Sequence, residues 1–167
     1  ELFKTTVREN ILYGNPGAAQ ADVDRAIDLA QCREIIDKLP HGLDTKIGTE
    51  GIYLSGGEQQ RIALARAFLK DAPIILLDEA TAFADPENER EIQLALARLM
   101  QGKTVVMIAH RLTSVTDADN IVVMEEGHIA EQGTHSQLLQ KEGLYCRMWK
   151  EYQQSVEWDI RKEAKHA

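Results

Sequence analysis

The sequence predicts an α/β fold in which a parallel β-sheet is covered by helices, with a helical section in the first third of the chain. Unbroken apolar runs of strand length, typical of strands buried on both faces, lie at residues 74–77 and 121–124, and TVVMIAH (104–110), whose apolar residues end before His110, predicts another buried strand. Segments with helical spacing of apolar residues alternate with these runs, as in βα units. A length of 167 residues, 44% of them hydrophobic, is enough for one core, so we expect a single domain.

Two helices are predicted in the first part of the chain. Within residues 21–38 apolar side chains recur at helical spacing, and Pro40 prevents the helix from continuing. Residues 41–53 contain three glycines and are loop-like. A second helix should run from about Glu58 to Lys70.

Capping patterns predict where two later helices begin. Asp85 followed by Pro86 resembles an N-cap with proline at the first helical position, and that helix should end near Met100. Thr134 and Gln137 form a capping-box pattern, in which the hydroxyl and the amide satisfy free backbone N–H groups.

A hairpin and a last helix are predicted near the end of the chain. The strand at 121–124 is followed by a turn at 126–127 and by a short strand at 128–132 that pairs back on it. Aromatic and apolar residues at helical spacing predict a final helix over about 145–160.

Composition narrows the classes of function. The formal net charge of −8 and the pI near 5.1 argue against a nucleic-acid partner, because phosphate backbones are bound by clustered Lys and Arg. No apolar run approaches the roughly 20 residues of a membrane span. Cys32 and Cys146 show neither metal-ligand spacing nor a disulfide pattern, so we interpret both as thiols in a reducing compartment.

Three polar side chains directly follow predicted strands. Asp78 and Glu79 follow one strand and His110 another, and parallel strands place such residues at the same sheet edge. An aspartate there can hold Mg²⁺, and a glutamate can deprotonate an attacking water. Taken singly, the carboxylates could be a solvated pair and the histidine a structural residue. Their coincidence favours a catalytic site.

The stretch LSGGEQQRIALARA places Ser55, Gly56 and Gly57 directly before a run of good helix formers. Such a turn at a helix N-terminus exposes backbone N–H groups and the positive end of the helix dipole, with no side chain to block close approach. The stretch therefore predicts a binding site for an anion. A dipole and its N–H groups contribute about 0.3–2 kcal/mol, so other groups must share the ligand.

The order and spacing of these motifs resemble the nucleotide-binding domain of ATP-binding-cassette (ABC) transporters. LSGGEQQRIALARA resembles the signature motif of that family, IILLDEATA its Walker B strand, and IAHR its switch histidine. LFKTTVRENILYG and DTKIGTEG resemble the exporter-type branch. The resemblance implies a P-loop NTPase-like (RecA-like) parallel core with an inserted helical signature subdomain.

The resemblance also implies domains and residue roles. Residues 1–70 would form the helical subdomain, 71–135 the second half of the ATPase core, and 136–167 a C-terminal helical segment. ATP and Mg²⁺ would be the ligands. By position, Asp78 would be linked to Mg²⁺, Glu79 would be the base, and His110 would sense the γ-phosphate. The residues expected to contact ATP held by the opposite subunit, or to line the dimer interface, are Leu54, Ser55, Gly56, Gly57, Glu58 and Asp85.

Several positions depart from the family pattern. Glu58 replaces the usual signature glutamine, Ala82-Phe83-Ala84 replaces the usual start of the D-loop, and Thr49 stands where exporters commonly carry a glutamate, although Glu50 is adjacent. The sequence contains no G-x-x-x-x-G-K-[ST] phosphate loop. The resemblance therefore implies the C-terminal portion of the domain, with the Walker A half before Glu1.

The function expected on this resemblance is ATP hydrolysis that powers an exporter-type transporter. The partners would be a second nucleotide-binding domain and a transmembrane domain on the same longer polypeptide, at the cytoplasmic face of a bacterial inner membrane. A chromosome-maintenance or DNA-repair ATPase shares some motifs, and a non-catalytic fragment is the third alternative. The stretch AFADPENE resembles that of exporter-type siderophore transporters that serve uptake.

Overall fold

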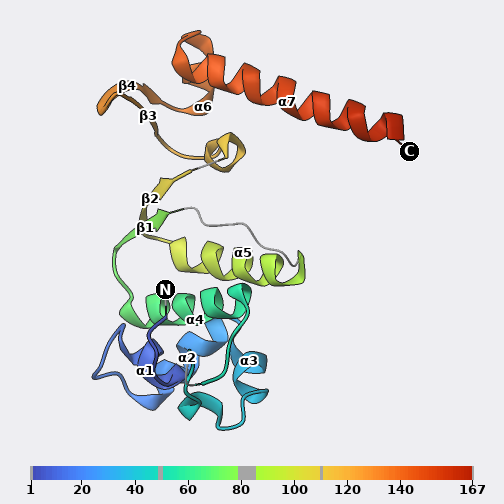
Figure 1. The fold of residues 1–167 in the computed structure, drawn as a ribbon. Helices are drawn as coiled ribbons and strands as arrows, with labels where there is room; N and C mark the ends of the chain where they lie inside the picture. The colour runs from blue at the N-terminus through green and yellow to red at the C-terminus, as the bar shows by residue number, and fades with distance from the viewer. Residues whose placement is uncertain (1, 49–50, 79–85, 110, 167) are drawn as a thin grey trace. The chain divides into compact units, whose positions relative to one another are not determined.

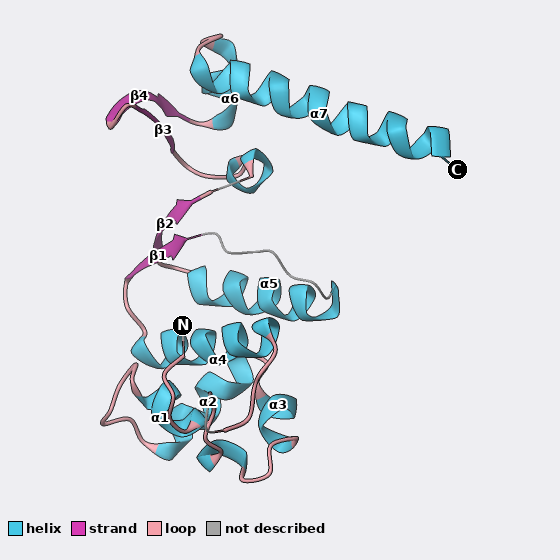
Figure 2. Cartoon of the chain, in the orientation of Figure 1, coloured by secondary structure: helices cyan, strands magenta, loops and turns pink. Residues whose placement is uncertain are grey.

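The structure is a computed structural model that describes residues 2–48, 51–78, 86–109 and 111–166. The chain divides into two compact units, Glu1–Met107 and Ile108–Ala167. Figure 1 traces the order of the elements along the chain, and Figure 2 shows that the first unit is mainly helical. The first unit contains α1 (Val7–Leu12), α2 (Gln20–Leu29), α3 (Arg33–Asp37), the 3₁₀ turn η1 (Gly42–Asp44), α4 (Gly56–Lys70), β1 (Ile74–Asp78), α5 (Pro86–Met100) and most of β2 (Thr104–Ile108).

Helix α4 lies at the centre of the first unit and packs against α1, α2 and α5. Its apolar side chains are buried together with those of the neighbouring helices, and burial of each such side chain typically stabilises the fold by about 1.5–3 kcal/mol. The most completely buried members of this core are Val7, Ile11, Ile27, Ala30, Cys32, Ile62, Ala65, Ile92 and Ala95. The core therefore fixes α4 from several sides.

The single helix predicted over residues 21–38 is wrong, because the structure has two helices there, α2 and α3. A Schellman turn separates them: the Cys32 N–H donates to the Ile27 carbonyl at 2.9 Å, and the Gln31 N–H donates to Asp28 at 3.2 Å. Gln31 adopts a left-handed φ of 57°, a conformation usually occupied by glycine. The sequence carries no glycine at this turn to signal the break.

Strands β1 and β2 form a two-stranded sheet and run in the same direction, joined through α5. The prediction that these strands are buried on both faces is wrong for the described chain. Ile75 packs against the helical core, whereas Ile74 and Leu76, on the opposite face, are 60% and 76% exposed. The reason is that, among the described residues, the helices cover one face of this sheet.

The second unit begins with the 3₁₀ turn η2 (Leu112–Val115), followed by β3 (Ile121–Glu125) and β4 (His128–Gly133). The predicted hairpin is confirmed: β3 and β4 are antiparallel, and Glu126 and Gly127 turn the chain with φ of 49° and 79°. The alternation of elements predicted one parallel sheet containing this third strand. In the described residues β3 instead pairs with β4, in a sheet separate from that of β1 and β2.

Helices α6 (His135–Gln140) and α7 (Leu144–His166) complete the second unit. The predicted capping box is confirmed, since the Thr134 hydroxyl accepts from the Gln137 N–H at 3.3 Å and the Gln137 side chain accepts from the Thr134 N–H at 2.9 Å. A small core of Ile121, Val123, Leu138 and Tyr145 holds the hairpin and helices together. Across the described ranges, no helix has both the length and the apolar character that a bilayer crossing requires.

Candidate functional site

The N-terminus of α4 is capped from within and faces solvent. The Ser55 hydroxyl accepts from the Glu58 N–H at 3.3 Å, and the Glu58 carboxylate accepts from the Ser55 N–H at 2.8 Å. This reciprocal capping box makes Gly56 the first helical residue, two residues before the predicted start. No hydrogen bond within the described part of the chain uses the N–H groups of Gly56 and Gly57. The first turn therefore keeps two outward donors.

Gly56 is exposed, and its surroundings are open. A Cβ built at this position meets nothing within 4 Å, and its φ lies outside the left-handed range. Neither packing nor backbone conformation within the described chain therefore requires glycine there. A glycine in a helix costs about 0.5–1 kcal/mol relative to alanine. The residue is explained if a ligand or another chain approaches this backbone closely.

Glu58 has a structural role that the sequence interpretation did not assign. Its carboxylate accepts from the Ser55 backbone and lies in the first turn of α4, where the helix dipole favours a negative charge. The departure from the family's glutamine therefore preserves the capping geometry. Next to it, the Gln59 side chain donates to the Leu54 carbonyl at 2.9 Å, which holds the residue before the cap in place.

Two arginines on α4 tie this helix to the rest of the first unit. Arg61 is buried and donates from Nη1 to the Gln31 carbonyl at 3.0 Å and to the Glu34 carboxylate at 3.3 Å. Arg66 donates to Asn10, which is completely buried. The sequence interpretation missed these residues. The available signal was a polar Asn10 on the buried stripe of α1, next to Ile11.

Cys32 lies at the Schellman turn beneath Arg61. Burial raises the pKa of this thiol to about 12, against a smaller lowering effect of the nearby Arg61 charge. The thiolate is the nucleophile and the metal ligand, so a raised pKa makes the side chain inert at neutral pH. Both cysteines are free and buried, and Cys32 acts as a small apolar member of the core.

Asp78 is the last residue of β1, and it is exposed. A carboxylate at the end of such a strand suits Mg²⁺, which takes one or two protein carboxylates and completes its shell with water and substrate phosphate. The described residues contain no group of three or more His, Cys, Asp or Glu side chains able to hold a metal by themselves.

The structure describes only some of the predicted site residues. Leu54, Ser55, Gly56, Gly57 and Glu58 lie together at the start of α4, and Asp78 ends β1. The other predicted residues fall outside the described ranges: Glu79, Asp85 and His110, together with the departures at Thr49 and Ala82-Phe83-Ala84.

Comparisons with known proteins identify similar sequences and a similar structure. Residues 1–82 match the family described as ABC transporter. The chain is 50% identical over 148 residues to the ATP-dependent lipid A-core flippase of Pseudomonas putida, covering 88% of this chain and 25% of that protein. It is 51% identical over 150 residues to the protein of the same name from Nitrosococcus oceani, covering 89% and 25%.

A solved structure titled "Structure of a bacterial Atm1-family ABC exporter with ATP bound" is also similar. The TM-score is 0.76 at 44% sequence identity, over 90% of this chain and 26% of that chain. The chain thus spans about a quarter of the length of the curated relatives it matches, 25% for each of the two flippases.

Proposed function

We propose that this chain, whose residues 1–82 match the ABC transporter family, is part of a nucleotide-binding domain that binds and hydrolyses ATP to power an exporter-type transporter. One observation carries the proposal furthest: the exposed first turn of α4, where Ser55 caps the helix and Gly56 leaves the backbone open. An anion such as the γ-phosphate of ATP can approach such a turn without meeting a side chain.

The proposed roles of the individual residues follow from the motifs in which they lie. Ser55 and Gly57 contact the γ-phosphate of an ATP molecule held by the opposite subunit, with Leu54, Gly56 and Glu58 shaping the turn. Glu79 deprotonates the attacking water, and His110 senses the γ-phosphate. Asp85 lines the interface between subunits. These roles are supported by the match of the signature, Walker B and switch-histidine motifs in sequence.

Magnesium and ATP are the proposed ligands. Asp78 would hold Mg²⁺ directly or through water, and the metal would neutralise negative charge on the phosphate groups. The protein's own contribution is geometric and electrostatic. The first turn of α4 presents two N–H donors and the positive end of a 15-residue helix to the developing negative charge.

The proposed architecture is RecA-like, with a helical signature subdomain at residues 1–70, the second half of the ATPase core at 71–135 and a C-terminal helical segment at 136–167. The proposed partners are a second nucleotide-binding domain and a transmembrane domain on the same longer polypeptide. The domain would lie at the cytoplasmic face of a bacterial inner membrane. The similarity to an ABC exporter of known structure and to an ATP-dependent lipid A-core flippase supports this assignment over a DNA-repair ATPase.

The experiment that tests this function is the change Glu79→Gln in the full-length parent protein. We expect ATP binding to be retained while hydrolysis falls by at least about a hundredfold, because a positioned general base typically contributes ~10²–10⁴. Steady-state phosphate release and equilibrium binding of labelled ATP measure the two quantities separately. The matched control is Glu89→Gln, an exposed glutamate on α5, which should leave both unchanged.

Asp78→Asn should behave differently from Glu79→Gln. The expected change is weaker Mg²⁺-dependent nucleotide binding, measured by titrating Mg²⁺ at fixed ATP. Turnover like that of the wild type in Glu79→Gln would refute the role of the base, and an unchanged magnesium dependence in Asp78→Asn would refute the metal role.

A further inference from the structure

Arg66 connects α4 to the N-terminal segment, residues 2–14, by two kinds of contact. Its guanidinium donates from Nε to the Asn10 carbonyl and from Nη2 to Asn10 Oδ1, both at 2.8 Å. The same group lies over the ring of Phe3 at 5.1 Å and over that of Tyr13 at 5.8 Å. The planar fork and the ring contacts together fix its orientation, and the ammonium group of lysine cannot reproduce this arrangement.

Asn10 is a completely buried side chain, and both the oxygen and the nitrogen of its amide make hydrogen bonds. Its Oδ1 also accepts from the Phe3 N–H at 2.8 Å, and its Nδ2 donates to the carbonyls of Phe3 and Thr6, both at 3.0 Å. A buried polar network with all of its members satisfied specifies one arrangement of the segments it joins. Asn10 and Arg66 therefore set how α1 and α4 lie against each other.

The backbone of the N-terminal segment also fits closely against α4. A Cβ built at Gly14 would overlap the Arg66 carbonyl oxygen and would lie 3.2 Å from the Lys70 nitrogen. The chain thus touches the C-terminal part of α4 directly at Gly14. Ser55 lies at the opposite end of this helix, about 16 Å along its axis from Arg66 at 1.5 Å per residue.

We propose that Arg66 is a positioning residue for the ATP reaction: by clamping α4 to Asn10, Phe3 and Tyr13 it sets the orientation in which Ser55 and Gly56 meet the nucleotide. The proposal rests on the proposed function. A tilt of a few degrees about the clamp moves the far end of α4 by about 1 Å, and a misplacement of this size far from the chemistry can cost ~10²-fold in rate.

The test uses Arg66→Lys in the full-length parent, which keeps the charge and removes the fork. We expect the KM for ATP to rise on the order of threefold to tenfold, the range typical of residues that act through a packed network. Rates are measured well below the melting temperature and normalised to folded protein. The matched control is Arg25→Lys, since the side chain of Arg25 is 72% exposed and pairs with Asp22 at the surface; its KM should not change.

A double-mutant cycle with Ser55→Ala separates positioning from a general structural role. If Arg66 acts through the first turn of α4, adding Arg66→Lys to Ser55→Ala should raise the KM little further. If Arg66 only stabilises the fold, the two effects multiply, and that outcome overturns the proposal. An unchanged KM in Arg66→Lys, or an equal rise in Arg25→Lys, overturns it as well.

A second variant decides the matter if Arg66→Lys does not yield folded protein. Phe3→Leu removes one ring contact at a half-exposed position and should raise the KM in the same direction by a smaller factor; no rise would overturn the proposal. The proposed function fails separately. If Ser55→Ala alone leaves the KM of the full-length parent for ATP unchanged, the proposed function is wrong, whatever the effect of Arg66→Lys.

Discussion

At Gly56 the protein's own packing gives no reason for a missing side chain, since a Cβ there meets nothing within 4 Å. The change Gly56→Ala should therefore be neutral or stabilise the chain by about 0.4–1 kcal/mol, because it reduces the freedom of the unfolded state. In the full-length parent the same change should weaken ATP-dependent turnover, because a methyl group would stand where the phosphate approaches. Chemical denaturation and ATPase assays of the same variant measure the two effects.

The opposite signs of these two effects are the informative result. Gly17→Ala is a matched control, because a Cβ at Gly17 makes only an ordinary contact of 3.8 Å with Asn15 and lies far along the chain from the first turn of α4. It should leave turnover unchanged. If Gly56→Ala keeps full ATPase activity, the interpretation of an open backbone that awaits a ligand is wrong.

Sequence reasoning reached some residues and not others for a physical reason. The turn at Ser55 was predicted because small residues directly before a run of helix formers are a local pattern, and the structure starts α4 there. The capping box between Ser55 and Glu58 was not predicted. The contact between Asn10 and Arg66 joins residues 56 positions apart. No local pattern encodes such a pairing. Glu79, Asp85 and His110 stay predictions, since they lie outside the described ranges.

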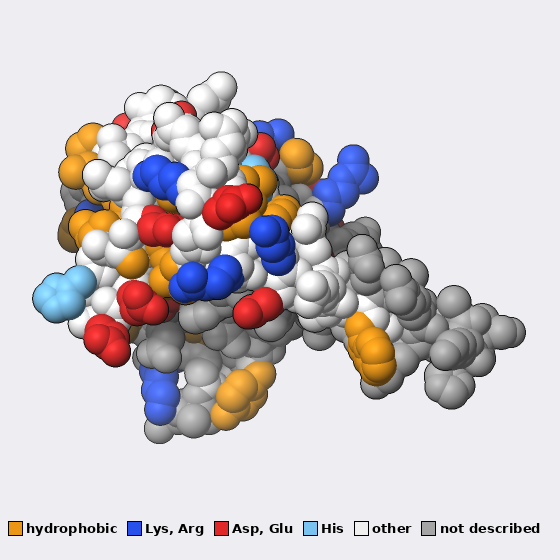
Figure 3. All heavy atoms as spheres, turned by 90° about the horizontal axis from the view of Figure 1, so that it is seen from above, with side chains coloured by type: hydrophobic (Ala, Val, Ile, Leu, Met, Phe, Trp, Pro, Cys, Tyr) orange, Lys and Arg blue, Asp and Glu red, His pale blue; other side chains and the backbone are white. Residues whose placement is uncertain are grey.

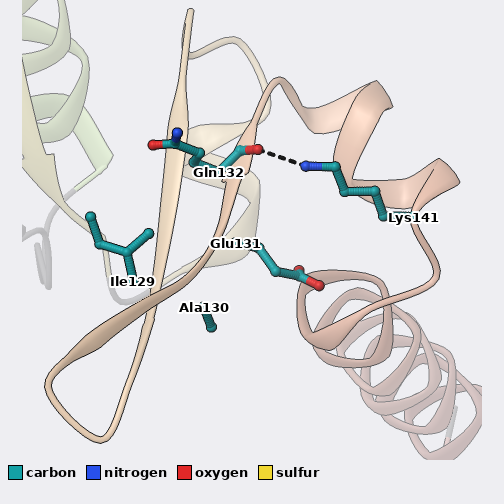
Figure 4. Close-up of a pocket in the computed structure, with 5 residues that line it drawn as sticks. All are labelled: Ile129, Ala130, Glu131, Gln132 and Lys141. Atoms are coloured by element: carbon teal, nitrogen blue, oxygen red, sulfur yellow. Dashed lines mark hydrogen bonds between the residues drawn. The ribbon is translucent and has the colours of Figure 1, made fainter.

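The start of helix α7 depends on a side chain from β4. Both carboxylate oxygens of Glu131 accept from this helix, one from the Leu144 N–H at 3.0 Å and the other from the Tyr145 N–H at 2.9 Å. Figure 4 shows Glu131 pointing toward that helix start, while Lys141 donates to the Gln132 carbonyl at 2.9 Å. The carboxylate thus satisfies two free donors at the positive end of the helix.

We expect Gly143→Ala to destabilise the second unit, because a Cβ at Gly143 would overlap the Glu131 carboxylate. Moving this carboxylate aside would break its two hydrogen bonds to the start of α7, a loss of about 1–3 kcal/mol, measured by chemical denaturation. In a Glu131→Ala background the overlap is gone, so adding Gly143→Ala should have little further effect. Equal losses from Gly143→Ala in both backgrounds would contradict this explanation.

At the scale of helices and strands, sequence patterns predicted the features that depend on neighbouring residues. The hairpin turn at Glu126-Gly127 and the capping box at Thr134 were predicted and are present. The break between α2 and α3 was missed because a glutamine, not a glycine, takes the left-handed position at Gln31. The Gln31 carbonyl accepts from the buried Arg61, which is a tertiary contact that supports the turn.

On the scale of the whole molecule, the two units each bury a core and also leave apolar strand residues exposed. Ile74 and Leu76 of β1 are examples in the first unit, and Met124 and Ile129 are 65% and 62% exposed in the second. On the face in Figure 3, hydrophobic side chains lie at the surface among acidic and basic ones. The apolar runs were found from the sequence, but the face of each strand that is covered depends on tertiary packing.

The resemblance to ABC transporters was predicted from the motifs and is confirmed, since residues 1–82 match that family. The arrangement of the strands was not fully predictable, since the sequence pattern implied one sheet and the described residues form two sheets. A motif is a string of residues at fixed spacing and can be recognised from the sequence alone. Strand pairing depends on partners that are distant in sequence.

The central claim is that the first turn of α4, at Ser55, completes an ATP site whose phosphate loop belongs to the other subunit. The most direct measurement is vanadate trapping of labelled nucleotide in a parent dimer with Ser55→Arg in one subunit and a disabled phosphate loop in the other. We expect trapping at one site, because both lesions then fall in the same site and the second site stays complete.

The control dimer carries both lesions in one subunit and none in its partner. There the account predicts damage to both sites and no trapping, while dimers with each lesion alone should still trap at one site. The reverse pattern would contradict the account: no trapping when the lesions are divided between the subunits, and trapping at one site when they share a subunit.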